Sequence, residues 1–220
     1  MLRLAVLASG RGSNLGALLA AIKDGRLNSQ VVGVFSDRAS APALEMARQN
    51  GIPALSLDPT AYSRRRDFDE ALFNEVTAVQ PDLIVCAGYM RLISERAVRR
   101  FQDRMINIHP SLLPKYPGLD THARALAAGD REHGASVHVV IPALDAGPVI
   151  AQARVPVLAC DTCESLTLRV LEREHPLLIQ CVKAISEGTI TLSGGQIHWN
   201  GKLLRSPLLL NSSDQLGETT

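Results

Sequence analysis

Aromatic side chains and an excess of charge of either sign are both scarce in this sequence. Phe, Trp and Tyr make up 4% of the 220 residues, so few rings are available on which unpaired nucleotide bases could stack. The formal net charge at pH 7 is +1, which gives no overall attraction to nucleic acid or to an anionic membrane. We therefore expect neither nucleic acid nor membrane as a partner, and we expect ligands to be recognised at local sites.

Long apolar runs are missing as well. No stretch approaches the roughly 20 apolar residues that a membrane-spanning helix needs. The first apolar run, Leu2–Ala8, is shorter than the core of a signal peptide and is followed at once by Gly10-Arg11-Gly12. These features predict a cytoplasmic protein.

Cysteine is the last scarce residue type, with Cys86, Cys160, Cys163 and Cys181 in the whole chain. A reducing compartment disfavours disulfides between them. A zinc site needs about four ligands, and the Cys160–Cys163 pair has no second pair of Cys or His at a matching spacing. We expect no metal site.

The first 110 residues carry a regular pattern of apolar runs. Hydrophobic residues make up 46% of the chain, enough to bury a core. Short apolar runs alternate with segments of helical length, which predicts βαβ units and a parallel sheet. The expected strands are Leu2–Ala8, Val31–Phe35, Ala54–Leu57, Leu83–Ala87 and Met105–Ile108, and the expected helices are Leu15–Ile22 with Asn14 as its cap, Ala41–Gln49, Arg65–Val79 and Ser94–Phe101.

The pattern changes in the second half of the chain. The extended runs Ala135–Ile141 and Pro148–Val157 follow each other without a helix-length segment between them, which predicts antiparallel pairing. A long helix is expected over Thr167–Ile185, and a hairpin over Ile190–Leu192 and Gln196–Trp199.

These elements predict an α/β fold with a mostly parallel sheet in the N-terminal half, and antiparallel strands and a long helix in the C-terminal part. No linker divides the chain, so we expect a single domain over residues 1–205, with one lobe at 1–110 and a second at 111–205. Residues 206–220 are expected to form a loose polar tail.

A glycine-rich loop, Ser9-Gly10-Arg11-Gly12-Ser13-Asn14-Leu15, joins the first expected strand to the first expected helix. Glycine lets the backbone approach a ligand, and amides at a helix N-terminus bind anions, so a phosphate suits this loop. The dinucleotide fingerprint would need glycine at position 15, and the Gly-Lys-Ser/Thr of the P-loop is absent. A tight turn without a ligand is the alternative.

Asn107 and His109 lie two residues apart at the end of an expected strand, so their side chains share one face. Ligands of open α/β sheets bind at that carboxyl end. An Asn amide can donate to a developing oxyanion, and a His can transfer protons near neutral pH. A purely structural histidine is the alternative.

Asp145 occupies the loop Leu144-Asp145-Ala146-Gly147-Pro148 between two extended runs. A carboxylate next to His109 would favour the imidazolium and orient the ring. Taken alone, Asp145 favours the interpretation as a turn residue.

Four segments together carry a resemblance to a known family: Ser9–Leu15, Ala87–Leu92, Asn107–Gly118 and Leu144–Ile150. In this order, and from the first residues to about Arg205, the chain resembles the phosphoribosylglycinamide formyltransferases, which are folate-dependent formyl transfer enzymes. The resemblance implies a Rossmann-like formyltransferase fold, small-molecule substrates, and a monomer or homodimer. It implies that the amine of glycinamide ribonucleotide attacks the formyl group of the cosubstrate 10-formyltetrahydrofolate, through a tetrahedral intermediate and without a metal.

Residue roles follow from the matched motifs. The resemblance implies His109 as proton donor, Asp145 as the group favouring its charged form, and Asn107 as the oxyanion ligand. The substrate-binding residues it implies are Gly12, Ser13 and Asn14 at the phosphate, and Leu171, Glu172, Arg173 and Glu174, of which Glu174 contacts the glycinamide and ribose end. The folate-binding residues it implies are Arg65, Met90, Arg91, Leu92, Ile93, Asn107, Ile141, Pro142, Ala143, Leu144 and Asp145. For Met90, Leu92 and Ile93, plain core packing is the alternative.

Positions 120, 122 and 138 complete the comparison with the family. Asp120 stands where the family often has His, which puts any auxiliary role of a histidine there in doubt. His122 matches the family and is open to a structural role. We interpret His138 as a strand residue that supports the wall of the site.

Three alternative functions are open. A formyltetrahydrofolate hydrolase carries an extra N-terminal domain, and methionyl-tRNA formyltransferase carries an extra C-terminal one, and we expect 220 residues to leave room for neither. A non-catalytic nucleotide-binding module is the third, and the joint presence of Asn107, His109 and Asp145 argues against it.

Overall fold

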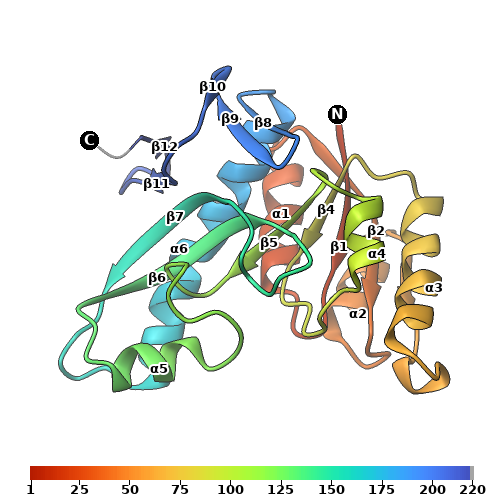
Figure 1. Cartoon of the computed structure of the whole chain (residues 1–220), viewed down its shortest axis with the longest axis horizontal. Helices are drawn as coiled ribbons and strands as arrows, with labels where there is room; N and C mark the ends of the chain where they lie inside the picture. Colours follow the sequence, from red (N-terminus) through yellow and green to blue (C-terminus); the bar gives the residue numbers. More distant parts are fainter. Residues whose placement is uncertain (219–220) are drawn as a thin grey trace. The chain divides into compact units, whose positions relative to one another are not determined.

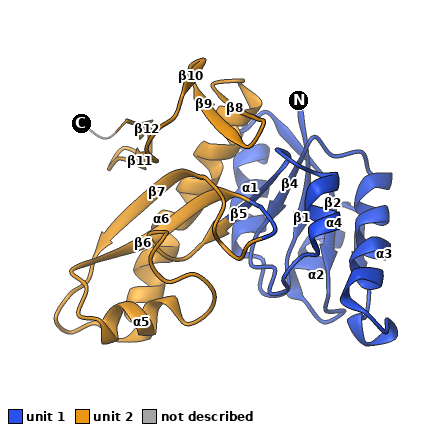
Figure 2. Ribbon diagram, viewed as in Figure 1, with its two compact units in different colours: residues 1–107, 140–142 blue, residues 108–139, 143–220 orange. Residues whose placement is uncertain are grey.

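The structure is a computed structural model in which residues 1–218 are described (Figure 1). The chain divides into two compact units (Figure 2). Unit 1 comprises Met1–Asn107 and Val140–Pro142, and unit 2 comprises Ile108–Val139 and Ala143–Thr220. The first boundary lies three residues before the lobe boundary expected from the sequence.

Unit 1 is built from alternating strands and helices, as the apolar pattern predicts. Its strands pair in the order β5-β4-β1-β2-β3, and all four pairings are parallel. The elements are β1 (Leu2–Leu7), α1 (Ser13–Lys23), β2 (Ser29–Ser36), α2 (Pro42–Gln49), β3 (Ala54–Ser56), the short 3-10 helix η1 (Pro59–Ala61), α3 (Arg65–Ala78), β4 (Leu83–Cys86), α4 (Glu95–Arg100) and β5 (Met105–His109), the last of which leads the chain into unit 2.

The core of unit 1 forms where α3 meets the sheet. Phe68, Leu72 and Val76 recur at intervals of four, so they share one face of α3, and all three are fully buried. They pack in one cluster with strand residues such as Leu7 and Ile84. Burying this face fixes the orientation of α3 on the sheet.

Unit 2 contains the antiparallel pair that the sequence predicts. Strand β6 (Glu132–Val139) pairs antiparallel with β7 (Val149–Pro156). Gly134 allows this close approach, because a Cβ there would overlap the carbonyl oxygen of Ala153. The remaining elements are α5 (Thr121–Ala127), α6 (Cys163–Ser186), β8 (Ile190–Ser193), β9 (Gln196–Trp199), β10 (Lys202–Leu203), β11 (Leu208–Leu210) and β12 (Leu216–Gly217).

Helix α6 and the hairpin after it agree with the sequence pattern. A capping box explains why α6 begins at Cys163: Thr162 accepts from the Ser165 amide, and Ser165 accepts from the Thr162 amide. The expected terminal hairpin is present as the antiparallel pair β8–β9. None of the helices in residues 1–218 combines the length and the apolar character that crossing a bilayer requires.

Three local expectations are wrong. The cap of α1 is Gly12, not Asn14, because the backbone reaches the helix through a left-handed residue with φ 78°. The tail is not loose over residues 208–217: β11 pairs with β7, and Leu208 and Leu210 are buried. Helix α5 was not expected, since its seven residues are too few for a clear helical period.

Candidate active site

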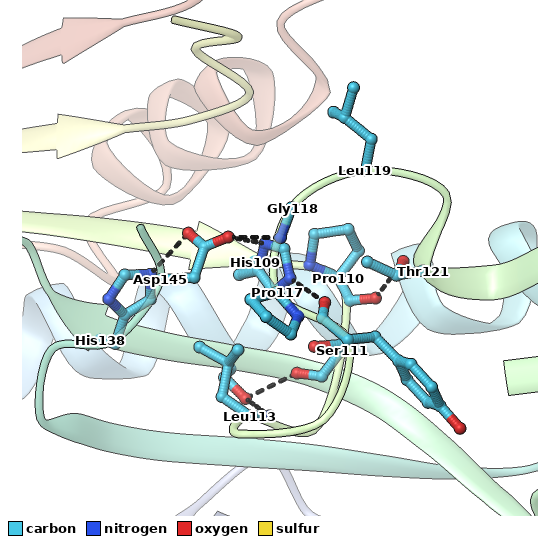
Figure 3. A network of polar contacts seen from close by, with 12 residues as sticks. His109, Pro110, Ser111, Leu113, Pro117, Gly118, Leu119, Thr121, His138 and Asp145 are labelled. Carbon is cyan, nitrogen blue, oxygen red and sulfur yellow. Dashed lines mark hydrogen bonds and ion pairs between the residues drawn. The ribbon is translucent and has the colours of Figure 1, made fainter. Parts of the chain in front are cut away.

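His109 and Asp145 lie next to each other in unit 2 (Figure 3). The His109 Nδ1 atom is 3.5 Å from the Asp145 Oδ2 atom, and both side chains are about nine-tenths buried. The other ring nitrogen, Nε2, lies 2.9 Å from the carbonyl oxygen of Tyr116. Since a carbonyl oxygen only accepts, Nε2 carries a hydrogen and donates it. The structure thus brings together the two residues that the sequence singled out for proton transfer.

Backbone geometry holds the Asp145 carboxylate in place. Asp145 adopts a left-handed conformation with φ 47°, which Asp tolerates better than most residues. Its Oδ2 atom accepts a hydrogen bond of 2.8 Å from the Gly118 amide. The loop after β5 therefore orients the carboxylate that faces His109.

His138 is the third member of this cluster. Its Nε2 atom lies 3.5 Å from Asp145 Oδ1, and its Nδ1 atom donates to the Val139 carbonyl at 3.0 Å. Asp145 is thus placed between two imidazoles, each of which has its other nitrogen on a backbone carbonyl. From the sequence, His138 was interpreted as a strand residue that supports the wall of the site, and its contact with Asp145 was not predicted. The available signal was an ionisable side chain inside the otherwise apolar extended run Ala135–Ile141.

Burial and charge act in opposite directions on these groups. Burial lowers the pKa of His109 and outweighs the Tyr116 hydrogen bond and the Asp145 charge, which raise it, so the net pKa lies below the ordinary value for histidine. Burial raises the pKa of Asp145. Hydrogen bonds from His138 and Gly118, together with the nearby histidines, lower this pKa by more than burial raises it, so the net pKa lies below the usual range for Asp. At neutral pH Asp145 is a carboxylate and resting His109 is mostly neutral. The expectation that Asp145 keeps His109 charged is therefore too simple, because burial has the larger effect.

The loop that carries Tyr116 and Gly118 is anchored to both strands of the antiparallel pair. Ser136 on β6 donates to the Ser111 carbonyl at 2.6 Å and accepts from the Leu113 amide at 3.0 Å. Gln152 on β7 donates to the Leu113 carbonyl at 2.9 Å. These buried bonds fix the backbone groups that hold His109 and Asp145.

Asn107 lies in unit 1, on β5, where it pairs in register with Cys86 of β4. It is half-buried and precedes His109 by two residues on the same strand, so the two side chains share a face. The alternation predicted from the sequence is therefore preserved.

The glycine-rich loop leads directly into α1, as expected. Gly12 has φ 78°, and a Cβ at this position would lie 2.8 Å from the Cβ of Ala43. Ser13 and Asn14 form the first turn of α1, where backbone amides have no partner within the helix. The loop therefore ends at a helix start whose first backbone amides the helix itself does not pair.

The residues expected to bind folate differ in exposure. Met90 and Leu92 are 56% and 44% exposed, whereas Ile93 is buried in the core cluster of unit 1, which favours core packing for Ile93. Arg91 stacks over the Phe68 ring at 5.0 Å, and Arg65 is exposed at the start of α3. The expected folate-binding segment 141–145 is divided between the units: Ile141 and Pro142 belong to unit 1, and Ala143, Leu144 and Asp145 belong to unit 2.

The α6 segment expected to bind substrate contains one residue with a clear structural role. Arg173 donates to the Asp214 carboxylate and to the Asn211 carbonyl, each at 2.6 Å. Its guanidinium therefore ties the C-terminal strands to α6. Leu171 is half-buried, Glu172 is exposed and Glu174 is buried. No three His, Cys, Asp or Glu side chains within residues 1–218 are gathered so as to hold a metal ion.

The parallel βαβ unit, the glycine loop before its first helix and the buried histidine–aspartate pair define a Rossmann-like α/β enzyme. The formyl transferase family model matches residues 2–182, and the chain belongs to this family of transferases.

Three similar proteins place the chain within the family. It is 43% identical over 203 residues to the phosphoribosylglycinamide formyltransferase of Escherichia coli (strain K12), covering 92% of this chain and 96% of the relative. It is 42% identical over 193 residues to the trifunctional purine biosynthetic protein adenosine-3 of Drosophila melanogaster, covering 87% of this chain and 14% of that protein. The solved phosphoribosylglycinamide formyltransferase of Coxiella burnetii is 44% identical with a TM-score of 0.88, covering 92% and 95% of the two chains.

Proposed function

We propose that this protein transfers the formyl group of 10-formyltetrahydrofolate to the amine of N1-(5-phosphoribosyl)glycinamide. The products are formylglycinamide ribonucleotide and tetrahydrofolate, in de novo purine biosynthesis. The observation that carries the proposal is the nearly full-length likeness to proteins named phosphoribosylglycinamide formyltransferase. We also propose that the protein is cytoplasmic, acts on small molecules, and is a monomer or homodimer.

The proposed reaction moves one proton while one bond replaces another. The amine nitrogen forms a bond to the formyl carbon, and the bond from that carbon to the folate nitrogen breaks. The amine loses a proton and the leaving nitrogen gains one. Burial keeps resting His109 mostly neutral, so the transfer runs through its imidazolium form. That form donates the Nε2 hydrogen to the leaving nitrogen, and the proton that the amine releases returns to Nε2.

The geometry around His109 supports one direction of proton transfer. Asp145 faces Nδ1 of His109, so Nε2 is the nitrogen that donates toward the leaving group. In the free protein the Tyr116 carbonyl accepts from Nε2, and the substrate takes over this hydrogen bond. The Asp145 carboxylate stabilises the imidazolium while it exists. Asn107 stabilises the oxyanion, as its position on the same face of β5 allows.

We assign substrate binding to separate groups of residues on the two units. The first turn of α1, at Gly12, Ser13 and Asn14, binds the phosphate, and Glu174 contacts the glycinamide end. The exposed apolar side chains of Met90 and Leu92 suit a flat pterin ring, and the exposed Arg65 suits the anionic end of the folate. Holding both substrates in register contributes up to about 7–11 kcal/mol of the barrier reduction in favourable cases.

The deciding experiment is an assay of the purified protein with glycinamide ribonucleotide and 10-formyltetrahydrofolate. We expect tetrahydrofolate to be released only when the ribonucleotide is present. Release without the ribonucleotide would instead identify a hydrolase, the alternative that the relatives do not favour. No turnover in either condition would identify a non-catalytic binding module.

The phosphate site is tested by Gly12→Ala. A Cβ at this left-handed residue meets Ala43 at 2.8 Å, which displaces the loop and its amides. We expect the KM for the ribonucleotide to rise about tenfold, since hydrogen bonds to a charged group contribute about 1.5–3 kcal/mol, and the KM for the folate to stay unchanged. Gly25→Ala is the matched control, with φ 73° and no atom within 4 Å of the added Cβ. An unchanged ribonucleotide KM would support the turn without a ligand.

A further inference from the structure

The carboxyl end of β1 lies between the ends of β4 and β2 in unit 1. The strand order β4-β1-β2 places β1 in the middle, and Figure 1 shows the three strands side by side. Ser9 follows β1, Asp37 follows β2 and Met90 follows β4. Because parallel strands end at the same edge of a sheet, these three residues, which are far apart in the sequence, come together there.

The Ser9 hydroxyl connects all three of these positions. Its Oγ atom donates a hydrogen bond to Asp37 Oδ1 and accepts one of 2.9 Å from the Met90 amide. A hydroxyl carries a single hydrogen, so the bond to Asp37 leaves the lone pairs of Oγ to face the Met90 amide. Asp37 therefore orients the Ser9 hydroxyl as the acceptor that Met90 needs.

The Ser9 side chain does here what strand pairing does elsewhere in the sheet. The parallel pairing of β1 with β4 is extended by a backbone hydrogen bond of 2.9 Å from the Ser9 amide to the Gly88 carbonyl. Met90 lies beyond this bond, and its amide donates to the Ser9 side chain instead. A backbone bond would form with almost any residue at position 9, whereas the bond to Met90 requires a side-chain acceptor there.

The Ser9–Asp37 contact is buried from solvent. Ser9 is 3% exposed, and the side chain of Asp37 is 6% exposed. Arg38 Nε lies 3.9 Å from Asp37 Oδ2, but the Arg38 side chain is 61% exposed, and such exposed ion pairs contribute little. The bond to Ser9 therefore has the larger influence on where the Asp37 carboxyl lies, and water does not readily replace the hydroxyl if it is removed.

Ser9 joins the two segments of unit 1 that are assigned to the two substrates. Ser9 is the first residue of the glycine-rich loop, whose residues Gly12–Asn14 are assigned to the phosphate. Met90 is the first residue of the folate segment, Met90–Ile93. Both segments belong to unit 1. A shift of either segment is therefore passed to the other through the Ser9 hydroxyl.

We propose that Ser9 is a positioning residue for both substrates: its hydroxyl, oriented by Asp37, holds the phosphate-binding loop and the folate segment in one fixed arrangement. A reaction between two bound molecules needs its reacting atoms at a fixed separation, so binding segments must be held relative to each other. The inference rests on the proposed function, and it adds to that function a pair of residues, Ser9 and Asp37, that act through the backbone of the two segments.

The first test is Ser9→Ala in the full chain, assayed with both substrates. KM for the ribonucleotide and KM for the folate should each rise about three- to tenfold, the usual contribution of one hydrogen bond, because both segments lose the same support. We expect kcat to fall less than about twofold, since His109 and Asp145 are unchanged. This result differs from that of Gly12→Ala, which raises the ribonucleotide KM alone. A rise in only one of the two KM values would overturn the proposal.

Ser29→Ala is the matched control for Ser9→Ala. Ser29 is a serine of β2 that is 2% exposed, and its hydroxyl has no hydrogen-bond partner within residues 1–218. This variant also removes a buried hydroxyl from unit 1, and it should leave both KM values unchanged. Equal effects of the two substitutions would show that loss of any buried hydroxyl explains the result, and would overturn the role of Ser9.

Asp37 provides a second set of variants for the same contact. Asp37→Ala frees the Ser9 hydroxyl to turn away from Met90, so both KM values should rise about two- to fivefold. Ser9→Ala/Asp37→Ala should match Ser9→Ala within about a factor of two, because both substitutions break one contact. Asp37→Asn keeps an acceptor oxygen and should recover most of the loss, and Arg38→Gln, which removes only the exposed ion pair, is the control. Fully additive effects of the two alanine substitutions would overturn the proposal.

Hydrogen exchange of the Met90 amide separates this proposal from the proposed function. Ser9→Ala removes the acceptor of this amide, so its exchange with deuterium, followed by NMR without any substrate, should become at least about threefold faster. Unchanged exchange would overturn the proposal whatever the activity. If the unmodified protein transfers no formyl group, the proposed function fails, and the Met90 exchange rate still decides whether Ser9 holds the segment.

Discussion

His109→Ala is expected to lower kcat by about 10²- to 10⁴-fold, the usual contribution of a positioned general acid or base. His109 is the group that faces Asp145 through Nδ1 and directs a donating Nε2 away from it. Without the imidazole, the proton must reach the leaving nitrogen from water. KM should change much less than kcat, because binding is assigned to other residues.

The fold should survive this substitution. His109 is the last residue of β5, and the loop after it keeps its bonds through Ser111, Leu113 and Ser136 when the ring's bond to the Tyr116 carbonyl is lost. Circular dichroism and thermal unfolding would check that the protein is intact. His198→Ala on β9 is the control, and it should keep nearly full activity. Near-normal turnover of His109→Ala would remove His109 from the mechanism.

Asp145→Asn is expected to have the next largest effect, lowering kcat by about 10²- to 10³-fold. Asn tolerates the left-handed conformation at φ 47°, and its side-chain oxygen can still accept from the Gly118 amide. The substitution therefore removes the charge while it keeps the shape of the loop. Asp24→Asn, at an exposed surface carboxylate, is the control and should leave kcat unchanged.

The same variant should lower the pKa of His109. The Asp145 carboxylate lies 3.5 Å from the ring and raises that pKa, opposing the larger effect of burial. Removing the negative charge leaves burial unopposed, so the imidazole must titrate at lower pH in the variant than in the unmodified protein. An NMR titration of the ring protons measures the shift. A pKa that stays the same or rises would show that Asp145 does not stabilise the imidazolium.

The strands, most helices and the order of the motifs follow from local pattern. Apolar runs such as Leu4–Leu7 and helical spacing such as Phe68, Leu72 and Val76 predict their elements because burial is repeated within each element. The place of Asn107 and His109 at the end of a strand is likewise local information. The C-terminal tail shows the limit of this reasoning. Its polar composition predicted a loose segment, but Leu208 and Leu210 are buried where β11 pairs with β7.

The sequence alone determined the parallel α/β half, the glycine loop before the first helix, and the candidates Asn107, His109 and Asp145, because each depends on residues close together in the chain. Only the tertiary structure placed Asp145 between His109 and His138, and only it joined the glycine loop to the folate segment through Ser9. These contacts join residues separated by loops, so their distances depend on the path of the folded chain. The tertiary structure also decided the protonation of His109. Burial has the largest effect on the pKa of this histidine, and burial cannot be predicted from the neighbouring residues in the sequence.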